Sequence, residues 1–166
     1  MPSEIAEIEP SLSGLEIEAI DLFISFMKLV GLPKSVGEIY GLLFVTETPL
    51  NSDQITDQLR ISAGATSQGL KILRSFRAVR AVYMPGDRRD HFVADLDLST
   101  FATAFLNDEL KPRLESAAER IHRMEILIDA MPSQKKAAAF KRVERLKHWV
   151  DRGRKIMPWI QKFLVS

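Results

Sequence analysis

The chain has 166 residues, of which 46% are apolar and 27% charged, as in ordinary globular proteins. It contains no cysteine, which excludes disulfides, thiolate metal sites and cysteine nucleophiles. The N-terminus is acidic, and the most apolar early stretch, residues 19–30, is interrupted by charged side chains. These features argue against a secretory signal and a membrane span. We therefore expect a soluble, cytoplasmic protein that has no contact with a membrane.

The net charge of +1 is unevenly distributed along the chain. Residues 1–60 carry a net charge of −7, residues 61–95 a net charge of +3 and residues 96–166 a net charge of +5. Between residues 61 and 89 there are six lysines and arginines and one acid. Local positive charge of this kind is the electrostatic footprint of nucleic-acid binding.

Two helices are predicted first. Apolar residues at helical spacing indicate a helix over residues 15–30, which Gly31 can end. Pro33 stands where a first-turn proline is tolerated and opens a helix to about Phe44. Gly37 and Gly41 lie one turn apart in this helix, so a neighbour can approach it closely.

Two short helices and a hairpin follow. Asn51 or Ser52 can cap a helix that contains Ile55 and Leu59, and Ser62 can cap another that runs to about Phe76. The period then changes to that of a strand at residues 79–83, and Pro-Gly-Asp at 85–87 predicts a turn. Residues 90–94 supply the returning strand. This two-stranded hairpin is the β-structure that the sequence pattern supports.

From Leu98 onward the chain is again helical. An apolar stripe runs through residues 101–128, Pro112 predicts a kink, and residues 131–133 break the helix. In the last helix, apolar side chains and one glycine recur over residues 139–164 at alternating spacings of 4 and 3. This spacing is typical of a heptad-like seam. Pro158 predicts a bend or an early end to this helix.

The helix over residues 63–76 has the pattern of a recognition helix. One face is apolar or small, and the other carries Ser67, Gln68, Lys71 and Arg74. Such a helix buries one face on its domain and offers polar groups to base edges and phosphates. A solvated surface helix has the same pattern. Arg88 and Arg89 at the tip of the following hairpin favour DNA binding, because they can follow the adjacent backbone or minor groove.

This order of elements resembles the helix-turn-helix of MarR-like regulators, and more closely their GbsR branch. The resemblance rests on Leu-Arg-Ile-Ser-Ala-Gly-Ala-Thr-Ser-Gln-Gly-Leu-Lys-Ile-Leu-Arg at residues 59–74, on the helix after Gly31, on Pro49-Leu-Asn-Ser-Asp-Gln-Ile and on Gly86-Asp-Arg-Arg-Asp-His-Phe-Val-Ala-Asp. It spans about residues 20–105. Arg60 and Arg77 stand where these families have glycine, in places that favour left-handed backbone.

The resemblance implies a mainly α protein: a winged helix-turn-helix with a two-stranded β-hairpin wing and long C-terminal dimerisation helices. We expect a flexible acidic N-terminus over residues 1–14, a DNA-binding domain over 15–97 and a helical dimerisation region over 98–166. The expected function is sequence-specific binding of double-stranded DNA by a homodimeric transcriptional regulator, at an imperfect palindrome. The predicted DNA-contacting residues are Lys34, Ser62, Gly64, Thr66, Ser67, Gln68, Lys71, Arg74, Arg88 and Arg89.

The apolar stripes of the first and last helices are longer than a small winged domain needs, so we expect them to pack across a two-fold axis. The predicted dimerisation residues are Phe23, Met27, Val143, Leu146, Val150, Met157, Ile160 and Leu164. The alternative function is a winged-helix module that docks on protein within a larger assembly. The basic recognition face discriminates against it, because a protein-docking wing needs no such charge.

Other chemistry finds little support in the sequence. The chain lacks a glycine-rich phosphate loop and a serine elbow, so we expect no enzyme and no cofactor. The pairs Glu119–His122 and Glu144–His148 are too few for a dinuclear metal site, and ordinary helix-surface pairing is favoured. A small-molecule effector is left open. Six aromatic residues can form a cage for a quaternary ammonium ligand, although core packing is the favoured interpretation. They are Phe23, Phe26, Tyr40, Phe44, Trp149 and Trp159.

Overall fold

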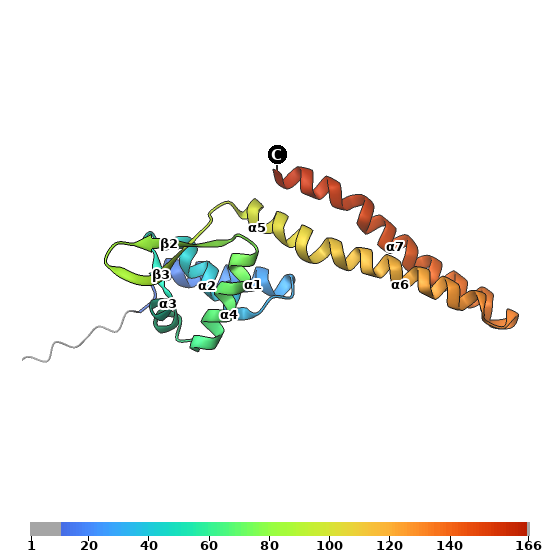
Figure 1. Ribbon diagram of the computed structural model, residues 1–166, viewed down its shortest axis with the longest axis horizontal. Coiled ribbons are helices and arrows are strands. Elements are labelled where there is room, and N and C mark those ends of the chain that lie inside the picture. Colours follow the sequence, from blue (N-terminus) through green and yellow to red (C-terminus); the bar gives the residue numbers. More distant parts are fainter. Residues whose placement is uncertain (1–10, 166) are drawn as a thin grey trace, which may run out of the picture. The chain divides into compact units, whose positions relative to one another are not determined.

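A computed structural model describes residues 11–165 of the chain. Most of the predicted acidic N-terminus, residues 1–10, therefore lies outside the described part. The chain forms two compact units, of which the first ends at Leu98 and the second begins at Ser99. The division lies one residue after the predicted one. The first unit contains the elements α1 to β3, and the second is helical (Figure 1).

The helices α1 (Gly14–Leu29) and α2 (Lys34–Val45) pack closely against each other. The α1 helix begins with a capping box between Ser13 and Glu16. A Cβ atom on Gly37 or Gly41 would lie 2.6 Å from backbone atoms of α1. The two glycines thus bring the helix backbones into contact, as their spacing predicts.

The helix-turn-helix consists of α3 (Ser52–Leu59) and α4 (Ala63–Ser75). Asn51 caps α3 in a second capping box, and Ser62 caps α4 by accepting a hydrogen bond from the backbone N–H of Ala65. Both caps agree with the sequence pattern.

Two non-glycine residues adopt left-handed backbone at the ends of these helices. Arg60, after α3, has φ of 53°, and Arg77, after α4, has φ of 58°. This conformation costs an L-residue about 1–2 kcal/mol. The expectation that these positions are left-handed is confirmed, so the turns keep their geometry without glycine.

The wing is the hairpin of β2 (Val79–Met84) and β3 (Asp87–Ala94), with Gly86 at φ of 86° in its turn. A third strand, β1 (Leu50–Asn51), pairs antiparallel with β3 and gives the sheet order β1-β3-β2. The sheet thus contains the predicted hairpin and one further short strand. A two-residue strand is too short to show a period in the sequence, and its existence depends on β3.

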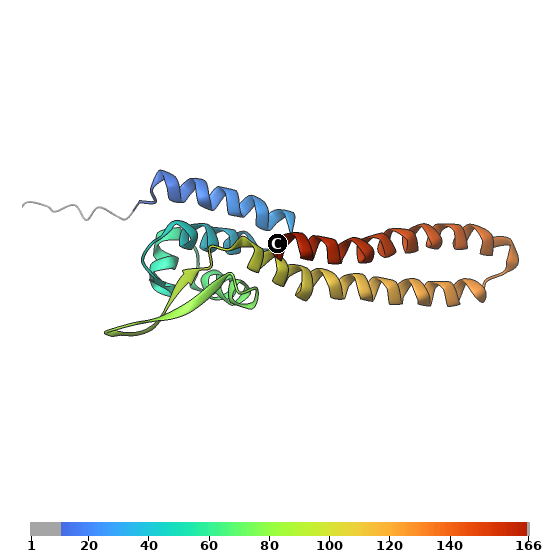
Figure 2. The same cartoon turned by 90° about the horizontal axis from the view of Figure 1, so that it is seen from above.

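The second unit contains α5 (Leu98–Phe105), a π-helical segment (Leu106–Leu110), α6 (Lys111–Asp129) and α7 (Ser133–Val165). We expect a kink at Pro112, and the structure has the π-helical segment directly before α6. Figure 2 shows α6 and α7 running side by side in opposite directions.

The α7 helix continues through Pro158 to Val165, so the predicted early end is wrong. Ion pairs link α7 to α6: the Lys147 Nζ atom lies 2.7 Å from Glu125 Oε1, and Arg154 Nη2 lies 3.0 Å from Glu115 Oε2. The pairing with Lys147 lowers the pKa of the Glu125 carboxyl. These contacts fix how the two helices align.

Candidate nucleic-acid interface

The α4 helix has one buried and one exposed face. Gly69, Leu70 and Leu73 are buried, whereas the predicted contact residues on the opposite face are exposed. The exposed residues of this face, which we call the recognition face, are Ser67, Gln68, Lys71 and Arg74. Gly64 and Ser62 at the start of the helix are also exposed, so the recognition face is continuous with the first turn.

Thr66 belongs to the opposite side, and its prediction as a DNA contact is wrong. Its side chain is fully buried. The Oγ1 atom lies 2.7 Å from Oγ1 of Thr56 and donates a hydrogen bond to the carbonyl oxygen of Ser62. Thr66 thus joins α3 to α4 and leaves no surface for a ligand.

The basic residues of this region differ in how their charge is balanced. Lys34 lies 2.8 Å from Glu38, which raises the pKa of its ammonium group. Within residues 11–165, no acidic side chain forms an ion pair with Lys71, Arg74 or Arg88. These three cations are exposed and available to an anionic partner.

Arg89, by contrast, binds two carboxylates of the same chain. Its Nη2 and Nε atoms lie 2.7 and 3.0 Å from the two oxygens of Asp87, and its Nη1 lies 3.3 Å from Asp53 on α3. The hydrogen bonds from Arg89 lower the pKa of Asp87 to about 2. Arg89 and Arg88 look alike in the sequence, but in the structure Arg89 links the wing to α3.

The wing carries two exposed residues that were not predicted from the sequence. Tyr83 is 81% exposed, near the turn, and Arg80 is exposed at the other end of β2. The strand register shifts between Val82 and Met84, where residues 88–90 of β3 lie opposite Tyr83. Such irregularities redirect side chains at functional edges. An aromatic residue two positions before the turn is the sequence feature from which Tyr83 could have been predicted as a wing residue.

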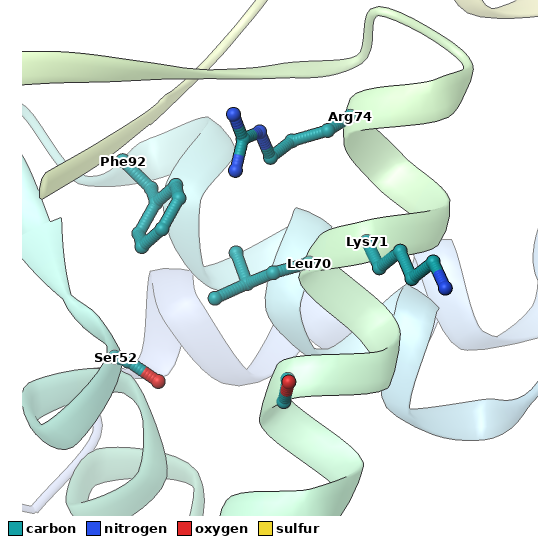
Figure 3. A pocket seen from close by; sticks show the side chains of 6 residues that line it. Ser52, Leu70, Lys71, Arg74 and Phe92 are labelled. Carbon is teal, nitrogen blue, oxygen red and sulfur yellow. The ribbon is translucent and has the colours of Figure 1, made fainter. Parts of the chain in front are cut away.

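A groove lies between the recognition face and the wing. It has a volume of about 360 Å³. Its lining residues are Ser52, Ser67, Leu70, Lys71, Arg74 and Phe92. In Figure 3, Leu70 and Phe92 face each other, the Ser52 side chain turns toward α4, and the Arg74 side chain extends toward Phe92. Ser52 and Phe92 were not predicted as site residues, because α3, α4 and β3 meet only in the fold.

Three of the aromatic residues considered for an effector cage pack as a core. The ring centroids of Phe23 and Tyr40 lie 4.7 Å apart, and those of Tyr40 and Phe44 lie 5.8 Å apart. The Tyr40 hydroxyl donates a hydrogen bond of 2.8 Å to the carbonyl oxygen of Asp95, and burial raises its pKa to about 12. This arrangement agrees with core packing of the three rings.

Three predicted dimerisation residues are buried within the single chain. Phe23 and Met27 are buried in the first unit, and Met157 is buried in the second. Their prediction as dimer contacts is therefore corrected: they are core residues, which a partner chain cannot reach while each unit stays folded. Leu146 and Ile160 are 51% and 40% exposed.

An apolar stripe of α7 that shares Leu146 and Ile160 with the predicted seam is exposed. It repeats at spacings of 3, 7, 4 and 3, which is helical spacing on one side of α7, and we call it the outer stripe. Its exposed members are Leu146, Trp149, Ile156, Ile160 and Phe163. On α1, a corresponding set of apolar side chains is exposed beside the buried one: Leu15, Leu22, Phe26 and Leu29.

Metal-binding and membrane-spanning features are absent from the described residues. In residues 11–165, histidine, aspartate and glutamate do not gather in groups of three that a metal ion needs. His122 lies 3.7 Å from Glu125, in an ordinary surface pair. Among the helices described, none combines the length and the apolar character required to cross a membrane.

Comparison with known proteins gives similarity in sequence and in structure. No family model matches the chain. It is 31% identical over 86 residues to the HTH-type transcriptional repressor GbsR of Bacillus subtilis (strain 168), which covers 52% of this chain and 47% of the repressor. The chain thus spans about half the length of this curated relative. The predicted resemblance to GbsR-like regulators is confirmed as a similarity.

The fold is similar to that in a crystal structure of a transcriptional regulator. The TM-score is 0.61 and the identity 14%, over 89% of this chain and 95% of the other. The predicted fold class, a mainly helical winged helix with long C-terminal helices, is confirmed, with β1 as an addition to the predicted hairpin.

Proposed function

We propose that the protein is a transcriptional regulator that binds specific sequences in double-stranded DNA as a homodimer, and that it is not an enzyme. The observation that carries the proposal is the exposed recognition face next to the wing. Its cations Lys71 and Arg74, and Arg88 on the wing, have no acidic partner among the described side chains. Duplex DNA offers the complementary surface, because its phosphates form a dense line of negative charge.

Within this proposal, α4 enters the major groove and the wing lies over the adjacent minor groove. Ser67 and Gln68 reach base edges, and Lys71, Arg74 and Arg88 bind phosphates. The similarity to a named repressor supports regulation of transcription as the purpose of the binding.

The outer stripe supports the proposed dimer. Trp149, Ile156 and Phe163 are 70%, 52% and 81% exposed. A row of large exposed apolar side chains along one side of a helix is typical of an interaction site. A second copy of the chain is the proposed occupant, since a two-fold dimer presents two recognition helices to a palindrome.

A salt titration of duplex binding tests the proposal. Affinity should fall steeply with salt, because each phosphate contact releases a counterion, and the log–log slope changes by about 0.9 per contact. Arg88→Gln should therefore flatten the slope by roughly 1.8 for a dimer with one such contact in each protomer. Arg89→Gln is the matched control and should flatten it less, because Asp87 already balances that charge.

Binding that is absent, or that does not respond to salt, would contradict DNA binding. It would favour the alternative of a winged helix that docks on protein. Equal effects of Arg88→Gln and Arg89→Gln would contradict the assignment of different roles to the two arginines.

A further inference from the structure

The groove beside the recognition face has a mixed chemical character. Leu70 and Phe92 form an apolar floor, and the polar lining consists of Ser52, Ser67, Lys71 and Arg74 (Figure 3). Arg74 is exposed and lacks an ion-pair partner within residues 11–165. An occupant that complements the groove must therefore carry an anion next to an apolar surface.

The position of the groove identifies which part of a duplex has this chemistry. The groove separates α4 from β3, that is, the recognition helix from the wing. If α4 lies in a major groove and the wing over the neighbouring minor groove, the sugar–phosphate strand that divides the two DNA grooves must pass between them. This strand has the required character, because each anionic phosphate is flanked by the carbon face of a deoxyribose.

We propose that this groove binds one nucleotide of the dividing strand. Arg74 and the Ser52 hydroxyl donate hydrogen bonds to the phosphate, and the deoxyribose rests against Leu70 and Phe92. Lys71 also lines the groove, but its ammonium end points away from Phe92 (Figure 3) and serves a different phosphate or a base. The inference rests on the proposed function and adds to it a defined site, which includes Ser52 and Phe92, for a single nucleotide of the backbone.

Methylphosphonate scanning tests the site. The probe is a duplex selected by the wild-type protein from a random pool, in which one phosphate at a time is replaced by a neutral methylphosphonate. The wild-type protein should lose about tenfold or more in affinity at one linkage in each half-site, between the major-groove contacts and the wing, since hydrogen bonds to charged groups are the strong ones.

Arg74→Gln should lose about as much on the unmodified duplex and should then be insensitive to the same linkage. Lys28→Gln, with the same change of charge on the exposed side of α1, should behave like the wild type at every linkage. Because Arg74 is exposed, Arg74→Gln should unfold at the wild-type temperature. Hydroxyl-radical cleavage should be suppressed at the deoxyribose next to that linkage.

The results separate two kinds of failure. A wild-type protein that binds its selected duplex but tolerates a methylphosphonate at every linkage between the two sets of contacts would overturn the groove proposal and leave the regulator proposal standing. Equal sensitivity of wild type and Arg74→Gln at that linkage would also overturn it, because Arg74 would then act elsewhere. A pool that yields no selected duplex would contradict the proposed function, and this inference with it.

Discussion

The two units of the chain differ in how completely they cover their apolar side chains. In the first unit, α1, α2, α4 and the sheet enclose Ile39, Leu42, Ile55 and Leu73, all of which are fully buried. In the second, the buried apolar residues within the described part are Ala104, Ile121, Ile128 and Met157. The first unit therefore has the larger apolar core, and the second leaves more of its large apolar side chains exposed than it buries.

This difference suggests a division of labour. Burial of apolar area stabilises a fold by roughly 25 cal/mol per Å², so the first unit can hold the recognition face rigidly without help. The second unit is a helical hairpin, and the side chains of its outer stripe are exposed. Changes in one unit should therefore leave the task of the other intact.

The largest effect is expected where two helix backbones touch. Gly41→Ala places a Cβ atom 2.6 Å from the Cα of Ile20, so α1 must move. We expect a loss of at least about 3 kcal/mol in the free energy of unfolding of the first unit, at the upper end of overpacking costs. Thermal or urea unfolding followed by circular dichroism measures it.

Gly64→Ala is the matched control for this change. Its nearest neighbour would be the Ser62 hydroxyl at 4.0 Å, so the methyl group has space. Replacing glycine by alanine within a helix should raise stability by about 0.5–1 kcal/mol. If both variants lose the same stability, close α1–α2 packing does not hold the first unit together.

The next effect concerns the second unit. Ile156→Asp places a charge in the outer stripe, and we expect dimerisation to weaken by about 2–3 kcal/mol, or roughly 30–150-fold. Helix content should be unchanged, because Ile156 is 52% exposed in the single chain. Sedimentation over a range of concentrations measures the dissociation constant.

Met157→Asp provides the contrast one residue further along. Met157 is 5% exposed and belongs to the core of the second unit, so this variant should lose helix content as well as dimers. A wild-type chain that sediments as an 18.8 kDa monomer at micromolar concentration would remove the outer stripe from any role in assembly.

Sequence discrimination should depend on the first unit alone. Gln68→Ala removes an exposed amide from the recognition face. The protein's preference for the correct base pair should fall by about 1–3 kcal/mol for each bidentate pair of hydrogen bonds that is lost. Dimerisation and non-specific affinity should stay close to wild type. Competition binding with single-base variants of the selected site measures the change, and a uniform loss over all sequences would assign Gln68 to the backbone or to folding.

The smallest effect is expected at Tyr40. Tyr40→Phe removes the hydrogen bond to the Asp95 carbonyl and should cost about 1 kcal/mol of stability. The folded protein raises the pKa of Tyr40 from 10.0 to about 12. The neutral phenol is therefore favoured in the folded state, and its contribution to stability is complete below pH 10 and is lost as the pH rises toward 12.

In that alkaline window, wild type should lose stability faster than Tyr40→Phe. Unfolding by urea at a series of pH values from about 9 to about 12 compares the two. Identical pH profiles would show that Tyr40 ionises as freely in the folded protein as in the unfolded chain.

Much of the first unit could be predicted because its signals are local. Ser62 as a cap, Gly86 in a turn and the close approach at Gly37 each depend on a few neighbouring residues. The left-handed backbone of Arg60 and Arg77 came from the resemblance, because a family pattern reports a backbone requirement that an arginine conceals.

What could not be predicted depends on contacts between distant residues. Thr66 is buried because Thr56, ten residues earlier, meets it across the turn. Arg89 is paired mainly with Asp87, two residues earlier, but its second carboxylate partner, Asp53, lies 36 residues away in the sequence. Each is a neighbour in space that no periodicity reveals.

The apolar stripes show the same limit. Both α1 and α7 carry two apolar stripes at helical spacing, and the period does not say which faces the chain's own core. Phe23 and Met27 are buried while Phe26 and Leu29 are exposed. Only the packing of α1 on α2 decides between them.

Selection of bound sequences from a random duplex pool tests the central claim most directly. The wild-type protein should enrich an imperfect palindrome whose half-sites are about one helical turn apart, because a two-fold dimer places two recognition helices in successive major grooves. A pool that shows no enrichment after repeated rounds, at a salt concentration where the protein still binds duplex, would contradict sequence-specific recognition by this chain.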